Sequence, residues 1–334
     1  MSTIMYKEIS EQNETLIMLR NYYIDKAKDL HKELSNYKRI YLMGTGASLQ
    51  ACYSSLPCFL LNTAVDVQVV GACDNTKITR IAKGDLVILV SQSGNSLETR
   101  IALDKLHSQK VKVWGLCNDD TSYLWKNADK QLPVFALNET GSATKSYSGS
   151  VYALYYIACG QNDELLDLLK VIIDDNKETL EIMPEQAKKY ATELRDRNII
   201  YIAGIEDSGP VAIQASIVLK EKTFMHVSGM PISEFRHGTV EVVTPGLPVI
   251  LVAIGDKEYE LALKHQQYLA SIEADCLIVS DQKSADVHFI NSLPAEFGMI
   301  NAQVFFQYLA EAIAVIRKLD VDNFKFLSKV VDKY

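Results

Sequence analysis

The segment SQSGNSLET, residues 91–99, carries many hydroxyl groups directly after the apolar run DLVILV. Ser91, Ser93 and Ser96 can each donate an O–H group, and Gln92 can donate an amide N–H group. Together they could surround an anion without a lysine. The segment lacks the GKS or GKT of a nucleotide P-loop, which favours a phosphate on a small molecule over a triphosphate. Capping of the following helix by the same residues is the alternative interpretation.

Two further polar turns follow apolar runs, GTGAS at residues 44–48 and NETGSATKS at residues 138–146. The carboxyl ends of parallel strands meet at one edge of a sheet, so three such turns would converge on one pocket. The helices that start at this edge would add free N–H groups, which attract anions. Convergence is a better indication of a binding site than any one of these short turns.

A glutamate and a histidine that could transfer protons occur in the second half of the chain. Glu221 ends an apolar helical pattern in VLKEKTF, and His237 follows in EFRHG. A glutamate can move a carbon-bound proton, and a histidine can exchange a proton with a ring oxygen near neutral pH. Opening a sugar ring and enolising the open chain need both groups. A solvated helix face for Lys220, Glu221 and Lys222, and a structural role for His237, are the alternatives.

These residues need strands and helices to position them. In the first half, short apolar strands separated by helices predict a parallel sheet covered on both faces. Helices are expected between Met5 and Asn36 and roughly over 144–160, and a helix after residue 48 is expected to be interrupted at Pro57. The expected strands are residues 39–44, 64–70, 85–90, 111–117 and 131–137.

The same pattern restarts near residue 198. RIYLMGTGAS and NIIYIAGIEDSG both read as a strand, a glycine turn and a helix start. We therefore predict two α/β domains of similar design, a structural duplication with little sequence identity, joined near residues 180–197. The strands expected in this half are residues 198–204, 247–255, 275–280 and 287–291, with a last helix near 297–317.

The composition is that of an ordinary folded protein. Of 334 residues, 48% are hydrophobic and the formal net charge is −8, which disfavours nonspecific nucleic-acid binding. The six cysteines form no CxxC pair and read as reduced, and the histidines show no metal-ligand spacing. No basic segment leads into an apolar run at the N-terminus, and no window is apolar for the ~20 residues that span a bilayer. We expect a cytoplasmic protein that does not bind membranes.

Taken together, SQSGNS, LKE followed by EFRHG, and the terminal DVDNFKFLSKVVDKY resemble the sugar isomerase (SIS) family over roughly residues 30–334. Within it they are similar to the isomerase half of glucosamine-6-phosphate synthase and its stand-alone relatives. The resemblance implies an α/β fold of two SIS domains, each a flavodoxin-like three-layer sandwich with a parallel sheet flanked by helices. The expected parts are a helical segment 1–30, SIS domains 31–180 and 181–318, and an active-site tail 319–334.

The resemblance also implies the roles of individual residues. Glu221 would be the proton-transferring glutamate, His237 the ring-opening histidine contributed across a homodimer interface, and Lys329 in FLSKVV the lysine that contacts the open-chain sugar. No metal or cofactor is expected. The residues expected to hold the phosphate are Ser91, Gln92, Ser93 and Ser96, and those expected to line the sugar site are Thr45, Gly46, Ser48, Ser142 and Thr144.

Two departures from the synthase indicate which kind of relative this is. The chain is too short to include the amino-terminal glutaminase domain as well, so we expect no ammonia production from glutamine. The synthase has a lysine three residues before the catalytic glutamate, where this sequence has Val218. The leading hypothesis is a deglycase that cleaves the C–N bond of a fructosamine 6-phosphate. A glucosamine-6-phosphate deaminase, an aldose/ketose phosphosugar isomerase and a noncatalytic phosphosugar-binding regulator are the alternatives.

Overall fold

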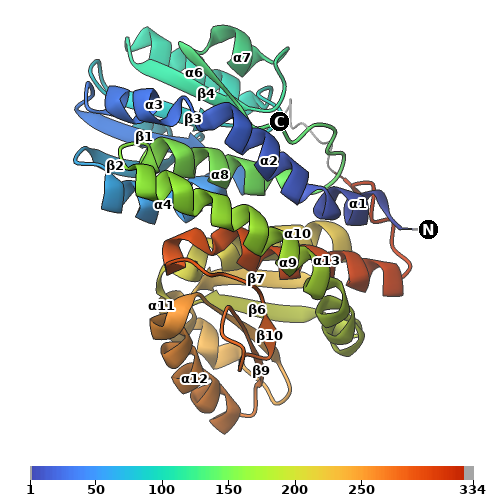
Figure 1. Ribbon diagram of the computed structural model, residues 1–334. Helices are drawn as coiled ribbons and strands as arrows, with labels where there is room; N and C mark the ends of the chain where they lie inside the picture. Colours follow the sequence, from blue (N-terminus) through green and yellow to red (C-terminus); the bar gives the residue numbers. More distant parts are fainter. Residues whose placement is uncertain (1, 327–334) are drawn as a thin grey trace. The chain divides into compact units, whose positions relative to one another are not determined.

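Alternating strands and helices form two five-stranded parallel sheets in this computed structural model, which describes residues 2–326 (Figure 1). Each sheet belongs to its own compact unit. The first-sheet unit contains residues 11–139, 143–170 and 325–326, and the second-sheet unit contains residues 2–10, 140–142 and 171–324. The predicted α/β class with two flanked parallel sheets is confirmed. The predicted domain boundaries after residues 30, 180 and 318 stay a prediction.

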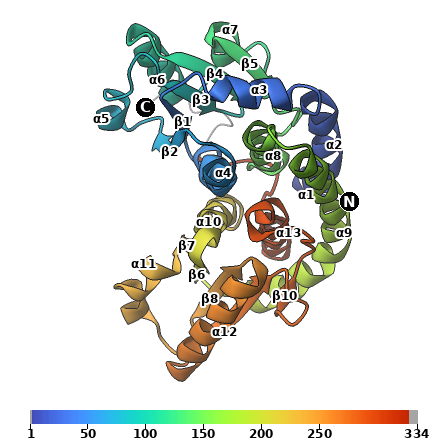
Figure 2. The same ribbon diagram turned by 60° about the vertical axis from the view of Figure 1, so that its left-hand side comes forward.

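The first sheet has the strand order β2-β1-β3-β4-β5, and all of its neighbours are parallel (Figure 2). Every residue of β3 is buried, because helices cover both faces of the sheet. The strands are β1 (Arg39–Gly44), β2 (Asp66–Gly71), β3 (Leu86–Val90), β4 (Lys112–Cys117) and β5 (Lys130–Pro133).

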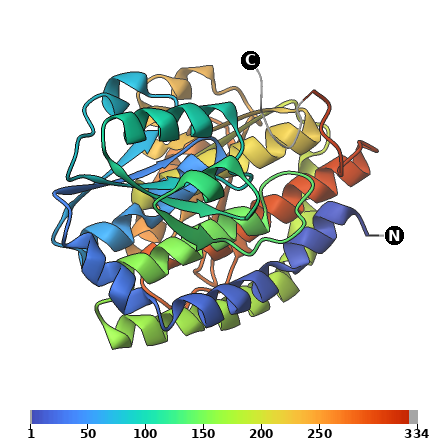
Figure 3. The same cartoon turned by 90° about the horizontal axis from the view of Figure 1, so that it is seen from above.

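Helices form a layer on each face of this sheet. Alternate strand residues such as Met43 and Leu89 share an apolar cluster with residues of α5, α6 and α7, and the teal α6 and α7 are seen from above in Figure 3. The intervening residues face α4, which packs on α8, and α8 in turn packs on α2 and α3. These helices are α2 (Gln12–Tyr23), α3 (Ala27–Leu34), α4 (Ala47–Asn62), α5 (Asn75–Ile78), α6 (Leu97–Ser108), α7 (Tyr123–Asn127) and α8 (Lys145–Cys159).

The second sheet repeats this topology, with the order β10-β9-β8-β6-β7. Helices α1, α10 and α13 share one apolar cluster with the strands, and α11 and α12 share another. The strands are β6 (Ile199–Gly204), β7 (His226–Pro231), β8 (Pro248–Ala253), β9 (Asp275–Ser280) and β10 (Val287–His288). The helices are α1 (Ile4–Ser10), α9 (Asp163–Leu194), α10 (Gly209–Thr223), α11 (Ile232–Arg236), α12 (Gly255–Ser271), α13 (Met299–Ile316) and the short 3-10 helices Glu206–Ser208, Thr239–Val242 and Ala295–Phe297.

Helix α13 is the most membrane-like helix of the described residues in length and composition. By length and composition it is the one helix within residues 2–326 that could cross a membrane, but 78% of it is buried inside the structure. It packs against α10 and α1 in the apolar core of the second-sheet unit. This burial is typical of the core helix of a soluble protein.

Three local predictions were wrong. Helix α4 runs through Pro57 without interruption, since the buried Cys58 and Phe59 compensate for the one hydrogen bond that a proline removes. The strand predicted over 131–137 ends at Pro133, because the chain then turns through positive φ angles at Phe135 and Leu137. The strand predicted over 287–291 is only the two-residue β10.

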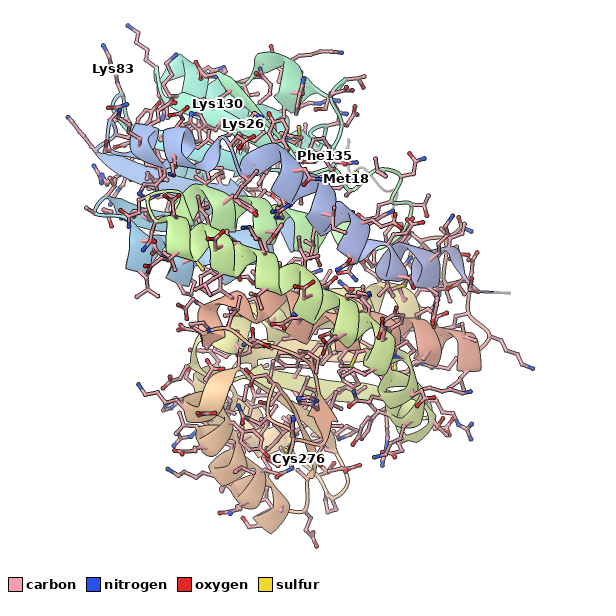
Figure 4. The ribbon with its side chains drawn as sticks, viewed as in Figure 1. Met18, Lys26, Lys83, Lys130, Phe135 and Cys276 are labelled. Atoms are coloured by element: carbon pink, nitrogen blue, oxygen red, sulfur yellow. The ribbon has the colours of Figure 1, made fainter. Side chains whose placement is uncertain are left out.

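Side chains of α2 and α3 contact the chain at the start of the short β5 and just beyond its end. The ring of Phe135, labelled in Figure 4, lies 5.4 Å from that of Tyr22 in α2. At the start of the strand, the ammonium of Lys130, also labelled, bonds to Glu33 of α3 and lies 4.4 Å from the ring of Trp114. The contact with Tyr22 holds the chain just beyond Pro133, where the sequence pattern predicted that the strand would continue.

The two sheets share a steric feature at the end of their first strand, in line with the predicted structural duplication. A Cβ atom on Gly44 would lie 2.7 Å from the backbone of Ser48, and one on Gly204 would lie 2.3 Å from that of Ser208. Both glycines therefore let the following helix start directly against the strand end. This close approach determines where the N-terminus of α4, and that of α10, can lie.

We expect Gly44→Ala and Gly204→Ala each to lower the free energy of unfolding by about 1–3 kcal/mol, because the added methyl group overpacks the turn. Gly71→Ala is the matched control, since its Cβ would meet no atom closer than 4.0 Å at the end of β2. It should change the stability by no more than about 1 kcal/mol. Urea unfolding followed by circular dichroism measures all three, and equal effects would contradict the steric explanation.

Candidate functional site

The order of the first sheet fixes where two of the polar turns lie. The chain runs from β1 outward to β2 and returns to β3 on the other side of β1. Met43 of β1 therefore lies opposite Leu89 of β3. In parallel α/β sheets, ligands bind outside the carboxyl ends of the two strands at which the order reverses. The turns 45–48 and 91–96 both leave the sheet at this switch point.

The turn after β3 uses its serine oxygens as acceptors for its own backbone. Ser91 Oγ accepts the N–H group of Gly94 at 3.1 Å, and Ser93 Oγ accepts that of Asn95 at 3.2 Å. The hydroxyl hydrogens remain available for donation to a ligand. Gly94 has a φ of 62°, and a Cβ there would lie 2.3 Å from Ser122 Oγ, so the tight turn requires a glycine.

Ser96 caps helix α6. Its Oγ accepts the N–H group of Thr99 at 3.4 Å and lies 2.6 Å from the Thr99 hydroxyl oxygen. The capping interpretation of this segment is therefore right for Ser96. It does not exclude anion binding, because the first turn of α6 still presents N–H groups that have no acceptor within the helix.

The turn after β1 is more open. Thr45 and Gly46 are exposed and Ser48 is half-buried, with the Ser48 N–H group donating to the Thr45 carbonyl at 3.1 Å. Gly46 has a φ of 55° and precedes the first residue of α4. A second helix N-terminus and two more hydroxyl groups thus lie at the same switch point.

The third polar turn follows the edge strand β5 and is built around a buried glutamate. Glu139 accepts the N–H group of Thr144 at 2.9 Å and its hydroxyl at 3.1 Å, and also binds Ser146. Ser142 is buried, and its hydroxyl has no hydrogen-bond partner among the described residues. The expected contacts of Ser142 and Thr144 with a sugar stay a prediction, as does the convergence of this turn on the other two.

The second sheet has the equivalent switch point between β6 and β8, and there a side chain of the protein takes the helix donors. The buried carboxyl group of Glu258 accepts the N–H group of Ile254 at 2.8 Å and that of Asp207 at 2.9 Å. It also accepts the hydroxyl of Ser208. A carboxyl group of the chain therefore takes the position at which an anion would bind.

No such carboxylate serves the first switch point. Within residues 2–326, no aspartate or glutamate side chain accepts a hydrogen bond from the backbone of residues 45–48 or 91–98. The hydroxyl-rich turns and helix N-termini of the first sheet are thus the better candidates for binding a phosphate. The two switch points differ because the second has a glutamate, Glu258, in the first turn of the helix after its third strand. This residue is visible in the sequence, but the sequence patterns did not single it out.

Glu221 lies near the C-terminal end of α10. Its side chain is half-buried, the preceding Lys220 is exposed, and the following Lys222 is completely buried. The alternative of a solvated helix face is therefore wrong for Lys222, whose burial nothing in the sequence pattern indicated.

Segments from distant parts of the chain pack around this end of α10. The Lys222 ammonium lies 4.3 Å from the ring of Phe324 and would lie 3.1 Å from a Cβ atom on Gly141. Arg317 donates to the carbonyl of Thr223 at 3.0 Å. These contacts hold the end of α10, and with it the backbone of the neighbouring glutamate, in one position.

His237 immediately follows α11, and its imidazole is exposed. The N–H group of His237 donates to the carbonyl of Ser233 at 3.2 Å. Phe235 is buried with its ring 5.8 Å from that of Tyr201, which fixes α11 against the second sheet. The strand that leads into α11 is β7, which the sequence did not predict because HVSGMP is a half-exposed edge strand with a glycine and a proline.

Two predictions about the site remain, the role of Lys329 and the absence of a metal. Lys329 lies outside the described residues. Among residues 2–326, no group of three or more His, Cys, Asp or Glu side chains is arranged to hold a metal ion.

Comparison with known proteins assigns the family. The family model described as "SIS domain" matches residues 33–159 and 193–288. The chain belongs to the SIS domain family. The first matched stretch contains β1 to β5 and the second contains β6 to β10, so each sheet is the core of one SIS repeat.

Curated relatives of this SIS protein include glutamine–fructose-6-phosphate aminotransferases. That of Aquifex aeolicus is 25% identical over 342 residues, covering 98% of this chain and 57% of the relative. That of Sulfurisphaera tokodaii is 27% identical over 336 residues, covering 98% of this chain and 56% of the relative. The chain thus spans a little over half the length of these relatives.

Solved structures share the fold of both SIS repeats. The C-terminal domain of glucosamine-fructose-6-phosphate aminotransferase from Francisella tularensis has a TM-score of 0.83 at 22% identity, covering 97% of this chain and 99% of that one. Glucosamine-6-phosphate deaminase from Thermotoga maritima has a TM-score of 0.75 at 19% identity, covering 95% of this chain and 99% of that one.

The buried Glu258 makes the stability of the folded protein depend on pH. Burial raises the pKa of Glu258 from 4.5 to about 7, and its hydrogen bonds oppose the rise. The folded protein then binds this proton more tightly than the unfolded chain. The stability contributed by this proton is therefore fully present below about pH 4.5 and is lost as the pH rises through about 7.

Glu258→Gln should remove this dependence. We expect the free energy of unfolding of the wild type to fall relative to that of the variant by about 1 kcal/mol per pH unit between about pH 5 and about pH 7. The exposed Glu260 of the same helix supplies the control Glu260→Gln, which should follow the wild type. Urea titrations across this range measure the difference, and parallel profiles for the wild type and Glu258→Gln would contradict the assignment.

Proposed function

We propose that this SIS protein is a cytoplasmic deglycase that hydrolyses the C–N bond of a fructosamine 6-phosphate, giving an aldose 6-phosphate and a free amine. The observation that carries the proposal is the first switch point, where two polar turns and two helix N-termini meet and where, within residues 2–326, no carboxylate accepts a hydrogen bond from the backbone N–H groups of residues 45–48 or 91–98. A sugar 6-phosphate carries the negative charge that such a site favours. Family membership supports a phosphosugar as the substrate.

The proposed reaction needs proton transfers and one water molecule. His237 assists opening of the sugar ring by exchanging a proton with the ring oxygen. Glu221 then removes a proton from C1 to form an enaminol and returns a proton to C2, which leaves an imine between C1 and the nitrogen. Water adds to C1 and the amine leaves. General acid–base assistance of this kind contributes about 10²–10⁴-fold in rate.

Val218 supports a reaction other than the synthase reaction. It lies one helical turn before Glu221 and is completely buried in the apolar cluster of the second-sheet unit. An isopropyl group therefore stands where the synthase, by the resemblance, has a lysine. Cleavage of an existing C–N bond by Glu221 and His237 needs no amine at this position.

Glu221→Gln should lower kcat by about 10²–10⁴-fold while leaving the affinity for hexose 6-phosphates unchanged, because it removes the proton acceptor and keeps the shape. Lys220→Gln, at the exposed neighbouring position, should retain wild-type turnover. Amine release measured by mass spectrometry and binding measured by calorimetry separate the two effects. Wild-type turnover by Glu221→Gln would disprove its assigned role.

We further propose a homodimer in which His237 of one subunit serves the site that contains Glu221 of the other. Each of the inactive variants Glu221→Gln and His237→Ala would then be complemented by the other. After random subunit exchange, the mixture should regain about a quarter of wild-type activity, because half of the dimers are mixed and each has one intact site. A mixture that stays inactive after confirmed exchange would show that each chain uses its own pair.

The choice of substrate is tested with a panel of phosphorylated fructosamines and amino sugars. Release of an aldose 6-phosphate and an amine from fructosamine 6-phosphates supports the deglycase. Ammonia from glucosamine 6-phosphate would indicate the deaminase, and interconversion of hexose 6-phosphates would indicate an isomerase. Tight binding without turnover of any of them would indicate a regulator that senses phosphosugars.

A further inference from the structure

A cavity in the second-sheet unit lies between α1, α9 and α13, which are all labelled in Figure 2. None of the residues that line it has a role in the proposed reaction. Its volume is about 330 Å³, at the lower end of the usual range for small-molecule sites, and its lining is mostly apolar with a few polar groups, as is typical of such sites. We call it the Glu311 cavity. Its lining includes Tyr6, Pro184, Tyr308, Glu311, Ala312 and Ile316.

Glu311 brings a buried carboxyl group to this cavity. The residue is only 8% exposed, and its Oε1 accepts the hydroxyl of Thr3 at 2.8 Å. In the part of the chain that the structure describes, no group donates a hydrogen bond to its Oε2 and no basic side chain forms an ion pair with it. Burial raises the pKa of this carboxyl, the bond from Thr3 opposes the rise, and the nearby charge of Asp322 adds to it. Because Glu311 lines the cavity, a cation bound there would offset the cost of burying the carboxylate.

Two tyrosine rings line the same cavity. Tyr308 lies three residues before Glu311 in α13, so both side chains are on one face of the helix. Its ring centroid is 5.2 Å from that of Tyr6 in α1, with 59° between the ring planes. The Tyr308 phenol oxygen lies 3.2 Å from the Ser10 hydroxyl oxygen, and this hydrogen bond fixes the ring. Since the faces of aromatic rings attract cations, the tyrosines favour the same ligand charge as Glu311.

The rest of the Glu311 cavity favours a ligand with an apolar body. Hydrocarbon groups of Pro184 in α9 and of Ala312 and Ile316 in α13 line it. Burying apolar ligand surface against such groups is favourable. Two further lining residues of α9, Glu185 and Lys188, are exposed, and their opposite charges cancel. The single negative charge of Glu311 therefore sets the charge that the cavity presents to a ligand.

We propose that the Glu311 cavity is an accessory binding site for a small organic amine with an apolar body. The ammonium group of the ligand binds the Glu311 carboxylate beside the rings of Tyr6 and Tyr308, and the hydrocarbon part contacts the apolar wall. Phosphosugars are polar and anionic, so the same features exclude them. The inference does not depend on the proposed function, because neither the serine-rich turns nor Glu221 takes part in it.

The test compares two probes of the same shape, 2-phenylethylamine and 2-phenylethanol, of which only the amine is charged. Calorimetry with the full chain should show that the amine binds at least about tenfold more tightly than the alcohol. Glu311→Gln keeps an acceptor for the Thr3 hydroxyl but removes the charge. It should weaken binding of the amine by about 10- to 100-fold and leave binding of the alcohol unchanged. Glu181→Gln, at an exposed position of α9 outside the cavity, is the matched control and should bind the amine as the wild type does.

A second variant and a second readout locate the binding. Ala312→Phe fills the cavity from a half-buried position and should abolish binding of both probes, with folding confirmed by circular dichroism. In the wild type, the methyl signals of Ala312 and Ile316 in proton–carbon NMR spectra should shift when the amine is added.

The proposal is overturned by any of three results. These are the absence of saturable binding of the amine, equal binding of the amine and the alcohol, and wild-type affinity for the amine in Glu311→Gln. Methyl signals of Ala312 and Ile316 that do not move on binding would also contradict it, since the amine would then bind elsewhere. Failure of the proposed function would look different, because it appears as a lack of turnover of fructosamine 6-phosphates and not as a loss of amine binding.

Discussion

The N–H groups at the starts of the helices that follow the first and third strands are the constraint on which both sheets depend. Each of these groups needs an acceptor, and the glycine at the end of the first strand brings the helix start close to the strand end. In the second sheet, Glu258 and its three hydrogen bonds meet the need from within the chain. In the first sheet, serine-rich turns lie at the equivalent switch point instead. One topology therefore gives one switch point whose N–H donors bind a carboxyl group of the chain and one whose backbone donors no carboxylate within residues 2–326 engages, as the proposed phosphate site requires.

Sequence patterns predicted the parts of the fold that depend on apolar periodicity and glycine turns. The strands around Met43, Leu89 and Leu251 and the duplicated strand–turn–helix unit all follow from local sequence. The edge strand β7 did not, because its pairing with β6 comes from the tertiary structure and its residues are half-exposed. Helix α4 likewise continues through Pro57 because its burial outweighs a local penalty.

The site was predictable only in part, for a related reason. Hydroxyl-rich turns after strands are visible in the sequence, and so are Glu221 and His237. The buried charges are not, because burial depends on neighbours that are distant in the chain. Lys222 packs against Phe324 at the end of α10, and the buried Lys145 pairs with Glu11 at 2.5 Å in the first-sheet unit. Each buried charge has partners that offset the cost of removing it from water. The sequence alone does not show which distant residues these partners are.

A crystal structure of the protein with a hexose 6-phosphate tests the central claim most directly, since it locates the phosphate in both units at once. The account predicts one phosphate per chain, held by the N–H and hydroxyl groups of residues 91–96, with Glu258 still bonded to Ile254 and Asp207. A phosphate bound instead at the second switch point, with the Glu258 carboxyl displaced, or one bound away from both switch points, would contradict it.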